Sequence, residues 1–418
     1  MPICAFLPEE MVVDILSRLP AKCLCRFKCV SKSWFALISS PNFAKTHLNR
    51  NDKPKRVFLV SDYFYSIDCT EASNNDDVIA MKLDYPLIKD KDPNLVTDIV
   101  ASCNGLLLVV LNNLNKRDDY PMYLCNPSTR EFKKLPDYNF RFCMYGLGYD
   151  SSMDNYKDTF VVVHSLKTSS WRRRWIQDFP YDNSFLLPCS GVFVNGSIHW
   201  LTNRALDHSP VIVAFDVADE KFRDVLLPNS HGILLPAKAH APSGLGVLGG
   251  CLFCYKEHDY AVQFDIWVME EYGVTESWTK FTIYIPDNMY NLEPLCVPLD
   301  NELLLKLYDE EMDEDEKIEE DILVMYNVKE KRLRYIMVDG IPLNGYQKLA
   351  VTYVESIVSP YFYCGIDRKE LSTMTDTIST LGALCSLILD WPSVFLFFSF
   401  FFFISLDIGY RFIDIIVK

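Results

Sequence analysis

The sequence lacks the features that mark secreted, collagenous and nucleic-acid-coating proteins. Lysine and arginine number 41 against 56 acidic residues, and the net charge of −15 repels nucleic acid and anionic membranes. Only 16 of 418 residues are glycine, which excludes a collagen-like chain. Fourteen cysteines in a chain of this length do not make a disulfide scaffold. The N-terminal residues show no basic region followed by an apolar run, so we expect no secretory signal and reduced thiols in the cytoplasm or nucleus.

What is present describes a globular protein. The chain is 49% apolar, 14% aromatic and 23% charged, whereas a disordered chain is richer in charge and poorer in aromatic residues. Its length allows two or three domains, or one large repeat domain beside a small module.

The first fifty residues predict a separate module of three short helices. Pro8, followed by two glutamates, is typical of a helix start, and apolar residues then recur at helical spacing until Pro20. A second apolar segment follows, and a third runs from Ser31 to Ser39, where Pro41 is expected to end it. A unit this small rarely buries enough surface to be stable alone, so part of it must contact a partner or the rest of the chain.

The order of residues in this module is more specific than their spacing. The segments LPEE (7–10), ILSRLPAK (15–22), RFKCVSKSW (26–34) and LISSP (37–41) closely resemble the F-box of plants over about residues 5–48. In that family the three helices dock on the Skp1 subunit of an SCF-type cullin–RING ubiquitin ligase. The resemblance implies that the docking face is supplied or supported by Leu7, Pro8, Ile15, Leu16, Leu19, Pro20, Leu24, Val30 and Trp34.

Two points qualify the resemblance. Cys23 and Cys25 stand where the family more often has serine and leucine. The apolar faces also allow another interpretation, in which the helices only cap the domain that follows. Docking is favoured because four or five buried leucine or isoleucine side chains, at roughly 1.5–3 kcal/mol each, support a stable interface.

Residues 57 to about 360 contain two recurring signatures. The first is a turn dipeptide before an apolar run, of the kind that supplies the positive φ angles of tight hairpins, and it starts at Asn104, Asn195, Gly249 and Asp300. The second is an apolar strand ending in Asn or Asp with a large apolar residue six positions later, in the pairs Asn126 and Phe132, Asp216 and Phe222, and Asn327 and Leu333. Looser versions join His164 to Trp171 and Glu270 to Trp278.

The spacing of these signatures predicts a β-propeller. The second signature recurs about every fifty residues, which is the period of kelch-type propeller blades. Five units are visible, and a sixth is expected if residues 56–60 pair with residues 349–354. That pairing would close the ring and protect its sheet edges.

This region also resembles a known family. The segments CNGL (103–106), CNPSTR (125–130), GLGYD (146–150), GVFVNGSIHWL (191–201) and AFD (214–216) look like the F-box-associated interaction domain of plants. The likeness covers most of residues 95–340. It implies a propeller that recruits a target protein, while the motifs themselves are scaffold positions.

The combined prediction is an α+β multidomain chain. It has a small N-terminal three-helix F-box (residues 1–50), an all-β propeller of about six blades (51–360) and an apolar C-terminal tail (361–418). The resemblance implies a substrate-recognition adapter without catalytic activity. Its partners would be a Skp1-like protein, the cullin and RING subunits reached through it, and an unknown target protein. An F-box scaffold that sequesters its target without ubiquitin transfer is the alternative.

The residues that imitate chemical motifs do not predict an enzyme, a cofactor or a metal site. Cys251 and Cys254 have zinc-ligand spacing, but no second pair follows and both fall in a strand-like run. The glycines of GLGVLG (244–249) imitate a dinucleotide fingerprint but lead into a strand rather than a helix. His199, Trp200 and Asp216 are expected to be core and turn residues.

Two charged segments are candidate target-binding sites. Residues 309–321 read DEEMDEDEKIEED and predict a solvated loop in one blade hairpin, which either steers a basic target or only aids solubility. Residues 171–175 read WRRRW, which is either a binding hot spot or a blade turn with both tryptophans packed inward. The candidate residues are Trp171, Arg172, Arg173, Arg174, Trp175, Glu310, Glu311, Asp313, Glu314 and Asp315.

The C-terminal tail does not fit the repeat pattern. Residues 393–406 read SVFLFFSFFFFISL, and residues 381–406 contain one acid in an otherwise apolar stretch. A membrane-spanning helix needs about twenty apolar residues. Two interpretations stay open, namely a membrane anchor at residues 381–406 and an extension that arises from translated non-coding sequence.

Overall fold

The computed structural model describes most of the chain up to residue 362. The described residues are 8–50, 55–60, 64–83, 95–113, 121–137, 144–153, 155–159, 162–168, 170–173, 180–181, 189–228, 242–258, 263–285, 289–297, 302–311, 318–339 and 349–362. The chain divides into two compact units, Met1–Cys364 and Gly365–Lys418. The second unit, with the candidate membrane segment at residues 381–406, lies outside the described residues. In the described ranges no helix combines the length and the apolar character that crossing a membrane requires.

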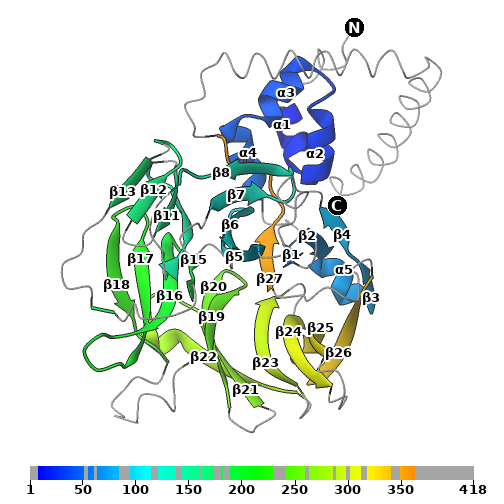
Figure 1. The fold of residues 1–418 in the computed structure, drawn as a ribbon. Helices are drawn as coiled ribbons and strands as arrows, with labels where there is room; N and C mark the ends of the chain where they lie inside the picture. Colours follow the sequence, from blue (N-terminus) through cyan, green and yellow to red (C-terminus); the bar gives the residue numbers. More distant parts are fainter. Residues whose placement is uncertain are drawn as a thin grey trace, which may run out of the picture. The chain divides into compact units, whose positions relative to one another are not determined.

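Four helices form the N-terminal module, one more than the sequence predicted. They are α1 (Glu9–Ser17), α2 (Ala21–Phe27), α3 (Lys32–Ile38) and α4 (Pro41–Leu48) (Figure 1). The expectation that Pro41 only ends the third helix is wrong, because Pro41 is the first residue of α4. Proline suits this position since it needs no N–H there, and Ser40 Oγ caps the helix by accepting a hydrogen bond from Phe43 N at 3.2 Å.

After the helical module, most of the described residues of the first unit form strands in consecutive sheets. Sheet 1 contains β27 (Leu349–Val354), β1 (Lys55–Val60), β2 (Phe64–Asp68) and β4 (Met81–Leu83). Sheet 2 contains β5 (Leu95–Cys103), β6 (Leu106–Asn113), β7 (Met122–Asn126) and β8 (Glu131–Lys134). Sheet 3 contains β10 (Leu147–Asp150), β11 (Asn155–Thr159), β12 (Val162–Ser165) and β13 (Ser170–Arg173).

Sheets 4 and 5 repeat this arrangement, and sheet 6 enlarges it. Sheet 4 contains β15 (Val192–Val194), β16 (Ser197–Asn203), β17 (Pro210–Asp216) and β18 (Lys221–Val225). Sheet 5 contains β19 (Gly244–Leu248), β20 (Cys251–Glu257), β21 (Gln263–Met269) and β22 (Trp278–Tyr284). Sheet 6 contains β23 (Met289–Cys296), β24 (Glu302–Glu311), β25 (Ile318–Asn327), β26 (Arg332–Asp339) and, in parallel with β26, β3 (Asp77–Ile79).

Short elements complete the described part of the unit. Helix α5 (Cys69–Asn74) lies between β2 and β3, and the short 3-10 helix η3 (Thr275–Ser277) precedes β22. Strands β9 (Met144–Tyr145) and β14 (Cys189–Ser190) pair in parallel.

The sheets form the predicted propeller. One edge strand of each sheet contacts its counterpart in the next, in the closed cycle β27, β5, β10, β15, β19, β23 and back to β27 (Figure 1). The expected pairing of the two ends is confirmed, because Arg56 on β1 lies opposite Tyr353 on β27. Five of these sheets have four strands, and sheet 6 gains β3 as a fifth. Pairing the two ends in one sheet closes the ring, because β27 contacts both β5 and β23.

The described examples of the two signatures include hairpin turns, as predicted, whereas Asp300 lies outside the described residues. Asn104 and Gly105 have φ angles of 53° and 83° between β5 and β6. After β7, the Asn126 carboxamide oxygen accepts hydrogen bonds from Ser128 N at 2.8 Å and Thr129 N at 3.4 Å, and Arg130 then has a φ of 60°. Asp216 and Asn327 bond their following N–H groups in the same way. This local bonding explains why Asn or Asp recurs at the end of these strands.

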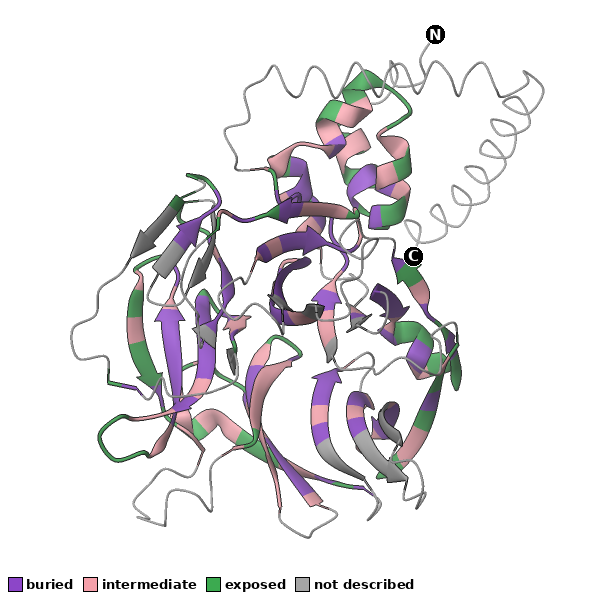
Figure 2. Cartoon of the chain, in the orientation of Figure 1, coloured by how far each residue is buried: buried purple, intermediate pink, exposed green. Residues whose placement is uncertain are grey.

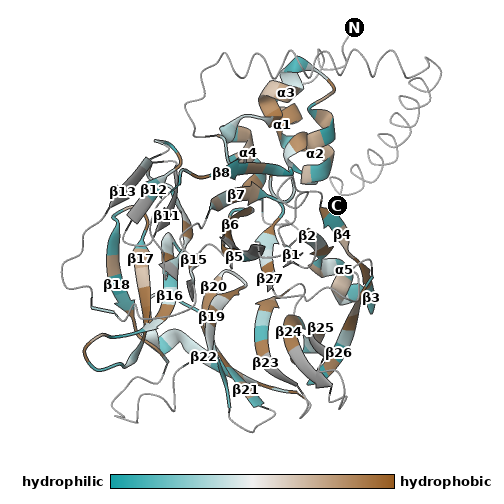
Figure 3. Ribbon diagram, in the orientation of Figure 1, coloured by the Kyte–Doolittle hydropathy of each residue, from teal (hydrophilic) through white to brown (hydrophobic). Residues whose placement is uncertain are grey.

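The core of the propeller lies between neighbouring sheets. Figure 2 shows buried residues along the middle of the strands and exposed ones on helices and turns, and Figure 3 shows apolar residues on the same strands. Trp200, Tyr65, Tyr326 and Phe215 are among the largest side chains that are fully buried. The inner strands therefore bury most of both faces, whereas outer strands such as β18 and β26 keep exposed residues.

Candidate functional site

Exposed apolar side chains on the N-terminal module form the first candidate site. Met11 and Ile15 on α1 are 51% and 49% exposed, and Val30, in the turn before α3, is 61% exposed. Ser31 Oγ holds the start of α3 by accepting a hydrogen bond from Trp34 N at 3.1 Å. Val30 therefore precedes a capped helix, whereas Met11 and Ile15 lie within α1, which begins after Pro8.

The structure sorts the predicted docking residues into two groups. Pro8, Ile15, Pro20 and Val30 are exposed, whereas Leu16 and Leu24 are buried. Leu19 and Trp34 are half-buried and pack against the same apolar cluster as Leu16. Leu7 lies outside the described residues. The exposed group is available to a partner, while the buried group supports the helices.

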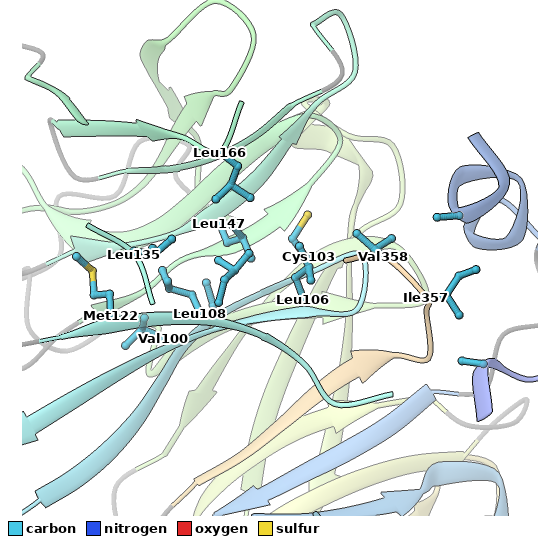
Figure 4. Packing of buried hydrophobic residues seen from close by; sticks show 14 of the residues in the cluster. Val100, Cys103, Leu106, Leu108, Met122, Leu135, Leu147, Leu166, Ile357 and Val358 are labelled. Carbon is cyan, nitrogen blue, oxygen red and sulfur yellow. The ribbon is translucent and has the colours of Figure 1, made fainter. Parts of the chain in front are cut away.

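The buried side of the module packs on the propeller. Leu16, Leu24, Ile38, Phe43 and Ala44 share one core cluster with residues of sheet 2 and of the chain that follows β27. Figure 4 shows members of this cluster from the propeller and the helices. The interpretation of the helices as a cap is therefore correct for this side of the module. It does not apply to the exposed side chains of Met11, Ile15 and Val30.

Residues 355–359, which we call the connector, join the module to the propeller. Glu355 is 6% exposed, and its Oε1 accepts a hydrogen bond from the backbone N–H of Ala21 at 2.7 Å, while Oε2 accepts one from Arg56 Nε at 3.0 Å. Ile357 and Val358, two apolar residues of the connector, are buried in the cluster shared by the module and the propeller (Figure 4). One carboxylate thus bonds both a helix start in the module and the first strand of the ring.

Sheet 2 binds the connector through its own turns. The Asn126 amide donates to the backbone oxygens of Ser356 at 3.0 Å and Val358 at 2.7 Å, and Ser356 Oγ donates to Asn104 O at 2.9 Å. Gly105 allows this approach, because a Cβ there would overlap Ser356 Oγ. The connector was not predicted from the sequence. The feature that could have indicated it is the pair of polar residues Glu355 and Ser356 inside an otherwise apolar run.

The candidate target-binding segments lie on two different sheets. Trp171, Arg172 and Arg173 belong to β13, where Trp171 lies opposite His164 of β12, so the predicted blade turn is wrong for these residues. Arg174 and Trp175 lie outside the described residues.

The acidic segment is more regular than the sequence predicted. Glu310 and Glu311 end β24 and lie opposite Glu319 and Ile318 of β25. The expectation of a loop throughout residues 309–321 is therefore wrong at both ends, because long strands extend the hairpin into it. Asp313, Glu314 and Asp315 lie outside the described residues.

Buried titratable groups in the propeller belong to the scaffold, as the sequence predicted. His199 is fully buried, and burial lowers its pKa to about 4, so the imidazole is neutral at pH 7. One ring nitrogen lies 2.7 Å from the Tyr272 hydroxyl and the other 3.2 Å from Val192 O. Burial raises the pKa of the Cys254 thiol to about 12, so the thiol is protonated at pH 7.

The glycine-rich segment at 244–249 has a packing role. It forms β19 and leads through a tight turn into β20, as expected, so no helix start is present to bind a phosphate. A Cβ at Gly244 would overlap the Tyr255 ring, and one at Gly246 would overlap the Phe253 ring. Within the described ranges no group of three or more His, Cys, Asp and Glu side chains is placed to bind a metal.

Family models match both parts of the chain. The F-box domain model matches residues 6–46, and the F-box associated beta propeller domain model matches residues 55–360. The two matches cover the helical module and the propeller respectively.

Proteins from Arabidopsis thaliana are similar over most of this chain. F-box protein CPR1 is 29% identical over 396 residues, which cover 83% of this chain and 88% of that protein. F-box/kelch-repeat protein At3g23880 is 27% identical over 385 residues, which cover 85% and 96%. Among solved structures, TolB from Acinetobacter baumannii aligns with a TM-score of 0.42 at 9% identity, covering 72% of this chain and 66% of TolB.

Proposed function

The chain belongs to the family of F-box proteins with an F-box-associated β-propeller domain, and we propose that it is the substrate-recognition adapter of an SCF-type ubiquitin ligase. The F-box, within residues 1–50, binds a Skp1-like protein and through it the cullin and RING subunits. The propeller, within residues 51–360, recruits the target protein. The adapter itself carries out no chemistry, because transfer depends on the effective concentration of the target near the charged conjugating enzyme.

The observation that carries this proposal is the division of the F-box into two sides. The buried side, with Leu16 and Leu24, packs within the chain, whereas Met11, Ile15 and Val30 are 49–61% exposed. Burying a Val, Leu, Ile or Met side chain at an interface contributes roughly 1.5–3 kcal/mol. The exposed group therefore supplies the contacts of a Skp1 interface, and the buried group keeps those contacts in place.

A binding experiment with matched substitutions tests the docking face. Ile15→Asp and Val30→Asp place a charge on exposed apolar positions, and each is expected to weaken Skp1 binding at least about tenfold, or 1.4 kcal/mol. Asn42→Asp, at an exposed position of α4, adds a carboxylate to the same module and is expected to leave Skp1 binding unchanged. Isothermal calorimetry on the full chain gives the affinities. Wild-type affinity in both apolar variants would reject this face.

A reconstituted ligase tests the adapter role without a known target. With Skp1, cullin, RING and conjugating enzyme present, ubiquitin is expected on lysines of the chain itself, and Ile15→Asp is expected to abolish this modification. Modification that continues undiminished in the docking-deficient variant would contradict the adapter role. We place this activity in the cytoplasm or nucleus, in keeping with the free cysteines among the described residues.

A further inference from the structure

Sheet 6 carries an exposed apolar surface on its two outer strands. Tyr335 and Met337 on β26 are 47% and 63% exposed, and Ile79 on β3 is 71% exposed. The intervening residue Ile336 and the β3 residue Val78 are buried in the core cluster on the opposite face. Because residues two apart on a strand share a face, the exposed side chains all lie on the solvent side of this part of the sheet.

Acidic residues alternate with these apolar side chains. The parallel pairing of β26 and β3 places Met337 opposite Asp77, and Asp339 opposite Ile79. Asp77 and Asp339 are both exposed. We call the five residues Tyr335, Met337, Asp339, Asp77 and Ile79 the outer face of sheet 6. Figure 1 shows the two strands that carry them, β26 and β3, next to each other.

The outer face is held rigid by Arg334. One terminal nitrogen of its guanidinium lies 2.7 Å from both Asn75 O and Asp76 Oδ1, and the other lies 2.9 Å from both Ala72 O and Ser73 O. These bonds attach the end of α5 and the start of β3 to β26. A preorganised surface loses little entropy when a partner binds.

The acidic hairpin lies in the same sheet. β25 pairs antiparallel with β26, and Leu323 lies opposite Ile336. Residues 318–321, which read IEED, form the other half of β25 and pair with β24. Sheet 6 therefore contains acidic residues in β24 and β25 in addition to Asp77 and Asp339.

We propose that the outer face of sheet 6 binds the target protein through an extended segment in which apolar residues and lysine or arginine alternate at every second position. This inference rests on the proposed function, since it assigns the propeller surface that recruits the target. Successive side chains of an extended segment point to opposite sides, so residues two apart face the sheet together and can match the mixture of Met337 and Ile79 with Asp77 and Asp339. Apolar contacts provide affinity, and the carboxylates select basic partners and speed association. Nucleic acids and anionic membranes are repelled by the same charges.

A peptide probe tests the charge and the location together. The probe is a peptide in which lysine and valine alternate at every second position with serine between them, and its counterpart has glutamate in place of lysine. The protein is the full chain bound to Skp1. The basic peptide is expected to bind with higher affinity than the acidic peptide, and its affinity is expected to fall as the salt concentration rises. Water-soluble carbodiimide, which joins amines to carboxylates, is expected to link its lysines to Asp77 or Asp339. Equal binding of both peptides, or links only at other sites, would overturn the proposal.

Substitutions on the face separate it from general attraction to an acidic protein. Met337→Lys and Ile79→Lys are each expected to weaken binding of the basic peptide at least about tenfold. Leu206→Lys changes the charge equally at a 96% exposed residue of the turn between β16 and β17, and is expected to leave binding unchanged. Equal weakening in all three variants would also reject the face. Skp1 binding, measured in each variant, reports independently on the docking proposal.

Discussion

The backbone N–H of Ala21 donates a 2.7 Å hydrogen bond to the carboxylate of Glu355, across 334 residues of sequence. The bond joins the start of α2 to the chain just after β27, the strand that completes the propeller ring. Because the same carboxylate binds Arg56 of β1, the F-box is attached where both ends of the propeller meet. An adapter needs such an attachment, since the target must be held at a fixed distance from the ligase.

We predict that Glu355→Ala destabilises the chain by about 2–4 kcal/mol, because it leaves the buried N–H of Ala21 and part of the Arg56 charge without this partner. Glu355→Gln keeps an oxygen acceptor and should cost less than the alanine variant. Denaturant unfolding measures both, and amide exchange should show faster exchange at Ala21. Glu330→Ala, at an exposed turn, is the control with little effect. Alanine and glutamine variants as stable as wild type would show that the connector is dispensable.

We predict opposite consequences for two neighbouring residues of α1. Leu16 is 2% exposed, so Leu16→Ala should destabilise the protein by about 2–5 kcal/mol. Ile15 is 49% exposed, so Ile15→Ala should change stability by no more than about 0.5 kcal/mol while weakening Skp1 binding. Unfolding curves and binding isotherms on the same samples check both effects. A stability loss in Ile15→Ala as large as in Leu16→Ala would contradict the two-sided F-box.

We predict that Gly105→Ala is more destabilising than Gly196→Ala. Both glycines have positive φ angles, 83° and 76°, so each substitution costs roughly 1 kcal/mol in backbone strain. At Gly105 the new Cβ also overlaps Ser356 Oγ, whereas at Gly196 it meets no atom within 4 Å. The difference between the two denaturant midpoints isolates the contact with the connector. Equal midpoints would mean that the connector moves away without cost.

We predict a stability contribution from Asp265 that disappears in acid. Burial alone would raise the pKa of Asp265, but hydrogen bonds from Lys280, Thr282 and His258 lower it to about 2. The unfolded value is about 4, so the contribution is complete above pH ~4 and is lost as pH falls toward ~2. Asp265→Asn should therefore cost about 1–2 kcal/mol at pH 7, since two of the partners are partly exposed, and much less near pH 2.

Unfolding at a series of pH values measures the Asp265 contribution. Asp219→Asn, at an exposed turn residue, is the control and should behave as wild type across the series. A constant difference between Asp265→Asn and wild type from pH 7 to pH 2 would show that the carboxylate charge does not stabilise the fold.

The acidic segment shows why the sequence predicted some features wrongly. Charge density at residues 309–321 indicates solvation, yet Glu310 lies in a strand opposite Glu319. Pairing across a hairpin depends on the length of both strands, and the apolar parts of β24 and β25 extend their pairing into the acidic residues. Composition alone contains no information on where that pairing stops. Pro41 was misread for a related reason, because a proline that ends one helix also suits the start of the next.

The sequence by itself determined the helical module and the hairpin turns. These features depend on neighbouring residues, as where Asn126 bonds the N–H groups of Ser128 and Thr129. Only the tertiary structure decided which F-box residues are exposed and that Glu355 attaches the module, because burial and long-range hydrogen bonds depend on residues hundreds of positions apart. The outer face of sheet 6 likewise exists only once β3 has paired with β26, some 260 residues further along the chain.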